Sequence, residues 1–164
     1  MIIAIMGVTG SGKTTEGSLL AKRLRWEYID ADDFHSAANK DKMHRGIPLT
    51  DADRMSWLES IHEKLVQADA EHRNLVLGCS ALKQTYREKL FRGLDVRLVY
   101  LKGDYQLIAQ RLRARKGHFA DEHILAAQFA DLEEPSDALV VDIHGEPEQI
   151  VDEICRRLDL PCAV

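Results

Sequence analysis

The sequence contains few cysteines, and none of them are at metal-binding spacing. Its three cysteines are Cys79, Cys155 and Cys162, and no CxxC motif occurs. An odd number cannot all pair within one chain, and structural zinc sites usually show closely spaced cysteines or histidines. The seven histidines include no HExxH motif. We therefore expect neither a disulfide framework nor a zinc site.

The sequence also lacks a long apolar run and an excess of basic residues. Its first apolar run, residues 2–6, ends at Gly7 and has no basic residues before it. A membrane-spanning helix needs about 20 apolar residues, and a signal peptide has a basic start. The net charge of −5 argues against a protein whose main ligand is nucleic acid. We expect no membrane or nucleic-acid partner and a cytoplasmic location.

The apolar pattern alternates between strand-like and helix-like segments within a chain of 164 residues, which suggests one domain over 1–164. Residues 33–46 are polar and basic and show no clear period, so no element is predicted there. The alternation predicts an α/β fold with a parallel sheet covered by helices on both faces. The predicted strands are 2–6, 26–30, 75–79, 96–101 and 139–143; the predicted helices are 14–24, one from 51 through 65, 82–91, 104–115, 121–132 and 147–158.

A complete phosphate-binding motif lies between the first predicted strand and the first predicted helix. Residues 7–14, GVTGSGKT, match G-x-x-x-x-G-K-[ST]. In such a loop the backbone N–H groups surround phosphate oxygens, the lysine reaches the outer phosphates and the hydroxyl holds Mg²⁺. The sequence therefore predicts a nucleoside triphosphate site with Thr14 as a metal ligand. Its predicted residues are Gly7, Thr9, Gly10, Ser11, Gly12, Lys13, Thr14 and Thr15.

The remaining motifs favour phosphoryl transfer to a small acceptor over NTP hydrolysis for signalling or work. Residues 39–42 imitate the base-reading N-K-x-D motif of GTPases, but their Asp is one position early, and residues 142–145 imitate D-x-x-G too late in the chain. The third predicted strand ends in Gly78-Cys79 and not in the Asp that a mechanical ATPase would use. A kinase for another acceptor and a non-catalytic ATP-binding regulator remain as alternatives.

Two carboxylates stand at the end of the second predicted strand, where ligands bind in doubly wound sheets. Asp30 and Asp32 there can hold Mg²⁺ through water and orient an acceptor hydroxyl, although a polar turn capped by Asp33 would give the same residues. Arg111 and Arg115 lie one turn apart on an apolar helix face, and a cation there needs an anionic partner such as a triphosphate. The alternative is a basic helix end that complements the helix dipole.

Three further cations are candidates for the acceptor. Arg54 stands at a predicted helix start, where it opposes the helix dipole, and would bind either a ligand carboxylate or Asp51 or Asp53. Lys83 and Arg87 would present two cations on one helical face, or would be ordinary surface residues. Cys79-Ser80 has no local base to activate it as a nucleophile, so Cys79 is better explained as a small core residue.

Several motifs together resemble the P-loop gluconokinases, relatives of shikimate kinase within the nucleoside-monophosphate-kinase-like group. The stretch at residues 30–36 departs from the family pattern at Ala31, at Asp33-Phe34 and at Ser36, all in the acceptor-binding segment. The shared motifs are MGVTGSGK at 6–13, Asp30-Ala31-Asp32 with His35, the stretch 43–58 from Met43 to Leu58, CSALKxxYR at 79–87, YLKG at 100–103, ARKGHF at 114–119, Gln128-Phe129 with Glu133 and Pro135, and VVDI at 140–143.

The resemblance implies ATP- and Mg²⁺-dependent phosphorylation of D-gluconate to 6-phosphogluconate, a phosphotransferase reaction with an alcohol acceptor. It also implies a cytoplasmic homodimer and a sheet of strand order 2-3-1-4-5, with an acceptor-binding segment at 33–68 and a lid at 115–124. It implies catalytic roles for Lys13, Asp32, Arg111 and Arg115. It implies that Thr14 and Asp30 bind the metal. The residues implied to bind gluconate are Asp32, Arg54, Lys83, Arg87, His118 and Gln128.

Overall fold

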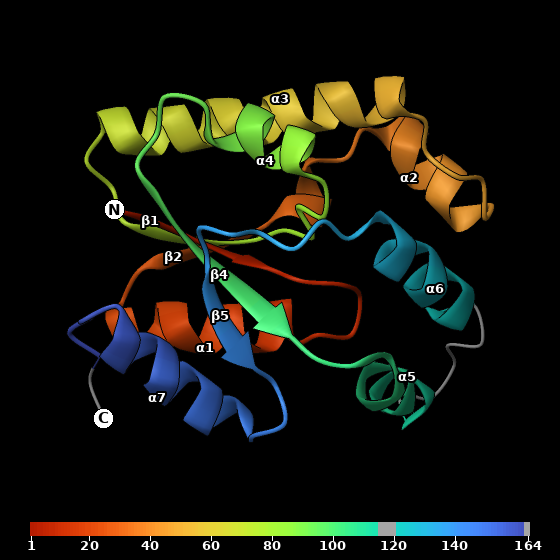
Figure 1. Cartoon of the computed structure of the whole chain (residues 1–164). Helices are drawn as coiled ribbons and strands as arrows, with labels where there is room; N and C mark the ends of the chain where they lie inside the picture. The colour runs from red at the N-terminus through yellow and green to blue at the C-terminus, as the bar shows by residue number, and fades with distance from the viewer. Residues whose placement is uncertain (115–120, 163–164) are drawn as a thin grey trace.

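A five-stranded parallel sheet forms the centre of the computed structural model, which describes residues 1–114 and 121–162 (Figure 1). The strand order is β2-β3-β1-β4-β5. Each neighbouring pair of strands runs parallel, so the predicted fold class and strand order are confirmed. The strands are β1 (Ile2–Met6), β2 (Glu27–Asp30), β3 (Leu75–Gly78), β4 (Val96–Lys102) and β5 (Leu139–Asp142).

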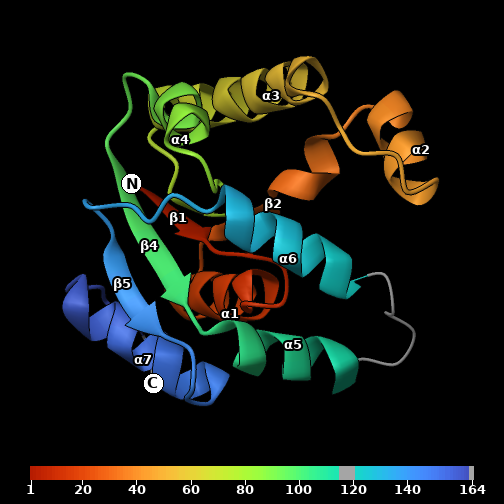
Figure 2. The same ribbon diagram turned by 45° about the vertical axis from the view of Figure 1, so that its right-hand side comes forward.

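Helices cover both faces of the sheet. Figure 1 shows α3 and α4 on one face and α1 and α7 on the other, while Figure 2 places α5 and α6 beyond the arrowheads of β1 and β4. The helices are α1 (Lys13–Leu24), the 3₁₀ helix η1 (Ala31–Phe34), α2 (Ala37–His44), α3 (Asp51–Ala70), α4 (Gln84–Phe91), α5 (Tyr105–Ala114), α6 (Asp121–Asp131) and α7 (Pro147–Arg157).

The core has two layers because successive residues of β1 point to opposite faces of the sheet. Ile3 and Ile5 belong to the layer that includes Leu20 of α1, whereas Ile2 and Met6 belong to the layer under α3. A strand with both faces buried must be apolar throughout, and this explains the unbroken run at 2–6. In the described part of the chain, no helix is long and apolar enough to cross a membrane.

The segment for which the sequence predicted no element, residues 33–46, contains the end of η1 and the whole of α2. Ser36 caps α2, since its side chain accepts a hydrogen bond from the Asn39 N–H at 3.1 Å. Among the residues of α2 only Asn39 is buried, and its amide donates to the Asp53 carbonyl of α3 at 3.0 Å. With one buried polar residue and no apolar stripe, α2 has no helical hydrophobic period.

The sequence predicted no disulfide framework and did not anticipate one local pair, which Cys155 and Cys162 form. The chain reverses after α7 through Asp159, which has a φ of 52°. The Leu160 N–H then donates to the Cys155 carbonyl at 2.9 Å, and this turn brings the two Cα atoms to 6.1 Å. An odd cysteine count excludes complete pairing but not a single local pair; Cys79 is the free, buried cysteine.

Candidate active site

The phosphate-binding loop connects β1 to the first turn of α1. Gly10 and Gly12 have φ values of 76° and 105°, in the left-handed region that a side chain disfavours. Gly12 is the N-cap of α1, so the N–H groups of the following residues have no partner within the helix. The Lys13 ammonium group donates to the Val8 carbonyl at 3.0 Å. Several of the predicted phosphate-binding residues border one cleft of about 420 Å³: Thr9, Gly10, Gly12, Lys13, Thr14 and Thr15.

Oxygen atoms suited to a divalent cation meet at the floor of this cleft. The Thr14 hydroxyl donates to the Asp30 carboxylate at 3.2 Å, and the Tyr28 hydroxyl donates to the same oxygen at 3.3 Å. No cluster of three or more His, Cys, Asp or Glu side chains that could hold a metal occurs among the described residues. Mg²⁺ characteristically uses one or two protein oxygens and completes its shell with phosphate and water, so Thr14 and Asp30 fit this ion.

Asp32 stands in the same cleft and is held by its neighbours. Its backbone N–H donates to the Asp30 carboxylate at 3.0 Å. The side chain reaches solvent, but the surrounding walls partly desolvate it, and this together with the Asp30 charge raises the pKa of Asp32 against the lowering effect of Lys13 and His35. A carboxylate with a raised pKa beside a phosphate site has the character of a general base or a hydroxyl-orienting group.

The turn that carries Asp32 is anchored to α3 by Trp57. The indole N–H of this buried residue donates to the Ala31 carbonyl at 2.7 Å. The Trp57 ring also stacks on His35, with ring centroids 4.5 Å apart. Burial, more than any nearby charge, lowers the pKa of His35, which favours the neutral ring. The sequence pattern predicted Trp57 only as a core residue of its helix and missed this second role.

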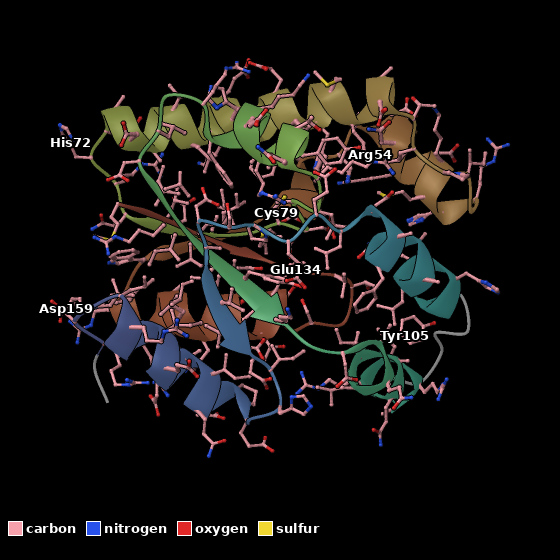
Figure 3. All side chains as sticks on the ribbon, viewed as in Figure 1. Arg54, His72, Cys79, Tyr105, Glu134 and Asp159 are labelled. Atoms are coloured by element: carbon pink, nitrogen blue, oxygen red, sulfur yellow. A yellow bond between two sulfur atoms is a disulfide. The ribbon has the colours of Figure 1, made fainter. Side chains whose placement is uncertain are left out.

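A second hollow, of about 100 Å³, adjoins the cleft and shares Ser80 and Gln128 with it. Its wall includes Arg54, which Figure 3 shows at the α2 side of α3. Arg54 lies 3.7 Å from the Asp51 carboxylate and donates to the Tyr86 hydroxyl at 3.5 Å, and Tyr86 in turn donates to Asp51 at 3.0 Å. The ion pair with Asp51 is therefore present, yet Arg54 still borders the hollow.

Gln128 connects the two hollows to the phosphate-binding loop. Its side-chain oxygen accepts a hydrogen bond from the Thr9 backbone N–H at 2.6 Å. Because the oxygen is engaged there, the NH₂ group of the amide remains as the donor at the junction of the two hollows. Gln128 comes from α6, which begins inside the predicted lid, so this helix directly contacts the loop that the motif identifies.

The structure does not bring Lys83 and Arg87 together as a pair of cations facing one ligand. Lys83 is the N-cap of α4, and its ammonium group lies 4.0 Å from the carboxylate of Asp131, which lines the second hollow. Arg87 is 8% exposed and donates to the backbone carbonyls of Ala81 and Leu82. Arg87 is not among the described residues that line the cleft or the second hollow. It borders a separate groove beside α4.

A third hollow, of about 400 Å³, lies on the other side of the phosphate-binding loop and shares Gly10, Gly12 and Thr15 with the cleft. Arg111 borders it and donates a hydrogen bond to the Ile143 carbonyl. The inward cation predicted from the sequence is thus placed beside the loop, with a backbone carbonyl as its partner. Arg115 and His118, and most of the predicted lid, lie outside the described residues.

Comparison with known proteins gives one consistent group. Residues 2–135 match the family model described as an AAA domain. A probable gluconokinase of Xenopus tropicalis is 41% identical, covering 97% of this chain and 94% of the relative, and a gluconokinase of Gluconobacter oxydans (strain 621H) is 42% identical over 94% and 89%.

Solved structures give the same result. A gluconokinase from Sinorhizobium meliloti 1021 superposes with a TM-score of 0.85 at 37% identity, covering 96% of this chain and 90% of that one. Shikimate kinase from Aquifex aeolicus shares the fold, with a TM-score of 0.60 at 18% identity. With the P-loop cleft, the neighbouring hollow and these identities over nearly its whole length, the chain belongs to the gluconokinase family of P-loop proteins.

Proposed function

We propose that this protein is an ATP-dependent kinase that phosphorylates the 6-hydroxyl of D-gluconate to give 6-phospho-D-gluconate and ADP. The observation that carries the proposal is a row of three adjoining hollows, two of which border the phosphate-binding loop. The middle one, bordered by Lys13 and Thr14, suits a triphosphate, the hollow beside Arg111 suits the nucleoside, and the smaller hollow beside Arg54 suits the acceptor. Family membership makes gluconate the first acceptor to consider.

The acceptor hollow has the chemistry that gluconate requires. Arg54 is a strong ligand for a carboxylate because its guanidinium can bind both oxygens. Gln128 and Ser80, which border both the hollow and the cleft, supply polar groups for sugar hydroxyls. In this arrangement the carboxylate lies at the Arg54 end and the 6-hydroxyl points towards Asp32. Lys83 would contribute positive charge at the rim.

The reaction we propose is direct transfer without a covalent enzyme intermediate. Asp32 orients the 6-hydroxyl and accepts its proton as the oxygen attacks the γ-phosphorus of ATP, and ADP leaves. Lys13 and Arg111 stabilise negative charge on the phosphates, as does Mg²⁺ when bound at Thr14 and Asp30. Burial raises the pKa of the Cys79 thiol to about 12, so this residue is not a nucleophile at neutral pH.

Several finer assignments remain predictions. We propose one kinase domain over 1–164 with its acceptor-binding segment at 33–68. The lid at 115–124, with Arg115 and His118, rests on the family resemblance. So do the homodimer, which light scattering would test, and the cytoplasmic location.

The test is the rate of ADP release with ATP and Mg²⁺ over a panel of acceptors: D-gluconate, shikimate, adenylyl sulfate and none. We expect release only with gluconate, and we expect Asp32→Asn to lower kcat by about 10²–10⁴-fold. Arg54→Gln should mainly raise the KM for gluconate.

Release with shikimate or adenylyl sulfate instead would keep the kinase and discard gluconate. Release independent of every acceptor, or nucleotide binding without any turnover, would contradict the proposal. Asp33→Asn is the matched control for Asp32→Asn, since Asp33 is the next carboxylate of the same turn and does not line the described cleft. It should retain the wild-type rate.

A further inference from the structure

A strained loop forms part of the wall of the acceptor hollow. Ser80, Ala81 and Leu82 form this part of the wall between β3 and α4. Ala81 has a φ of 44°, in the left-handed region where a side chain meets the neighbouring carbonyl. A non-glycine residue stays in that conformation only where the surrounding structure holds it. The contacts that hold this loop therefore determine the shape of the acceptor hollow.

Arg87 supplies two of these contacts. Its guanidinium donates to the Ala81 carbonyl at 2.8 Å and to the Leu82 carbonyl at 3.0 Å. Glu133 supplies two more, because its N–H donates to the Leu82 carbonyl at 2.9 Å and its carboxylate accepts from the Gln84 N–H at 2.6 Å. A charged donor that bonds two consecutive carbonyls fixes the direction of both peptide planes.

The rest of the Arg87 surroundings argue against a direct contact with an anionic acceptor. Arg87 does not line the acceptor hollow; it borders a groove of about 530 Å³ that also contains Glu88, Arg92, Glu134 and Asp137. Its three carboxylates outnumber the guanidinium groups of Arg87 and Arg92, so the groove carries net negative charge, which disfavours a carboxylate ligand. The loop itself lies between the Arg87 guanidinium and the acceptor hollow, since its carbonyls face Arg87 and its residues line the hollow.

We propose that Arg87 is a positioning residue that fixes the Ser80–Leu82 wall from behind and does not touch the acceptor. This inference rests on the proposed function, because it replaces the direct gluconate contact that the sequence motif suggests for Arg87. It separates two cations that the resemblance assigns to gluconate into two roles: Arg54 binds the substrate charge, and Arg87 binds the protein backbone.

The first experiment compares D-gluconate with D-gluconamide, in which an uncharged amide replaces the carboxylate. Removing a charged hydrogen-bond donor should lower kcat/KM at least about tenfold. For Arg87→Ala the fold-loss should be the same with both acceptors, while the KM for ATP stays unchanged. For Arg54→Ala the loss in kcat/KM should be smaller with gluconamide than with gluconate, because gluconamide has no carboxylate for Arg54 to bind. An Arg87→Ala loss that shrinks with gluconamide would show direct contact with the carboxylate and overturn the proposal.

The second experiment is a rescue. Glycine adopts the left-handed conformation without the steric cost that alanine meets. Ala81→Gly in the Arg87→Ala background should therefore recover kcat/KM by about threefold or more. If Arg87 touched only the acceptor, Ala81→Gly would bring no such recovery. A double variant without recovered kcat/KM would therefore overturn the proposal. Arg87→Lys, which keeps one charged donor, should be affected less than Arg87→Ala.

The third experiment needs no acceptor and so separates this proposal from the proposed function. Hydrogen–deuterium exchange of the peptide 79–87 should be faster in Arg87→Ala, while the phosphate-loop peptide 7–13 exchanges as in the wild type. Unchanged exchange in 79–87 would overturn the proposal even if gluconate is the substrate. Arg92→Ala is the matched control: Arg92 borders the same groove but pairs with Glu59, so we expect wild-type exchange and kinetics.

Discussion

Replacing Trp57 with phenylalanine should weaken both the fold and the acceptor site. The indole N–H is the donor to the buried Ala31 carbonyl at 2.7 Å. Leaving that carbonyl without its donor costs about 1–3 kcal/mol, and the smaller ring leaves a cavity worth about 1 kcal/mol more. We expect the free energy of unfolding to fall by about 2–4 kcal/mol, which lowers Tm by about 5–15 °C in a chain of this size.

The same substitution should affect catalysis, because Ala31 precedes Asp32 and the Trp57 ring stacks on His35. Below the unfolding transition, kcat/KM for gluconate should fall about tenfold or more, since small displacements of a reacting group are costly. Urea unfolding gives the stability, and ADP release gives the rate.

The matched control for this substitution is Trp26→Phe. Trp26 packs against the core layer on the other face of the sheet, and no hydrogen bond from its indole is seen in the described part of the chain. We expect Trp26→Phe to lower the free energy of unfolding by only about 1 kcal/mol and to leave kcat/KM unchanged. Equal stability losses for Trp26→Phe and Trp57→Phe, or a wild-type kcat/KM in Trp57→Phe, would refute the reasoning.

Three further predictions concern the site itself. Asp30→Asn should raise the Mg²⁺ concentration for half-maximal rate about tenfold; an unchanged Mg²⁺ dependence would remove Asp30 from the metal site. The folded-state pKa of Asp32 is raised, and in the proposed reaction its ionised form accepts the proton, so kcat/KM should be lost as pH falls through a value above the usual 3.9 or so; a pH–rate profile flat down to pH about 4 would contradict this. Tyr86→Phe should raise the KM for gluconate by about 2–10-fold through Arg54, with the ATP KM unchanged, whereas a change confined to ATP would show that Tyr86 acts elsewhere.

The fold and the phosphate-binding loop could be predicted because each depends on local residue pattern. An apolar run with both faces buried has few explanations other than an interior strand, and the motif at 7–14 requires glycines and a lysine at fixed spacing. Asp30 and Asp32 followed from the position of strand ends in a parallel sheet. These inferences need no knowledge of contacts between distant residues.

The contacts that the sequence could not predict depend on tertiary structure. Lys83 and Arg87 are four residues apart, but Lys83 is the N-cap of α4 and lies outside its regular turns, so the expected common face does not form. The partner of Arg87 is a strained loop, and no residue type marks such a loop in advance. In the same way, the partner of Arg111 is a backbone carbonyl of a segment 32 residues away.

Identification of the reaction product tests the central claim most directly. Uniformly ¹³C-labelled D-gluconate is incubated with the protein, ATP and Mg²⁺, and the product is examined by ¹³C and ³¹P NMR. We predict one new phosphate monoester whose phosphorus couples to C6, formed in equal amount with ADP. A phosphate on another carbon, or ADP released with only inorganic phosphate and unchanged gluconate, would contradict the assignment.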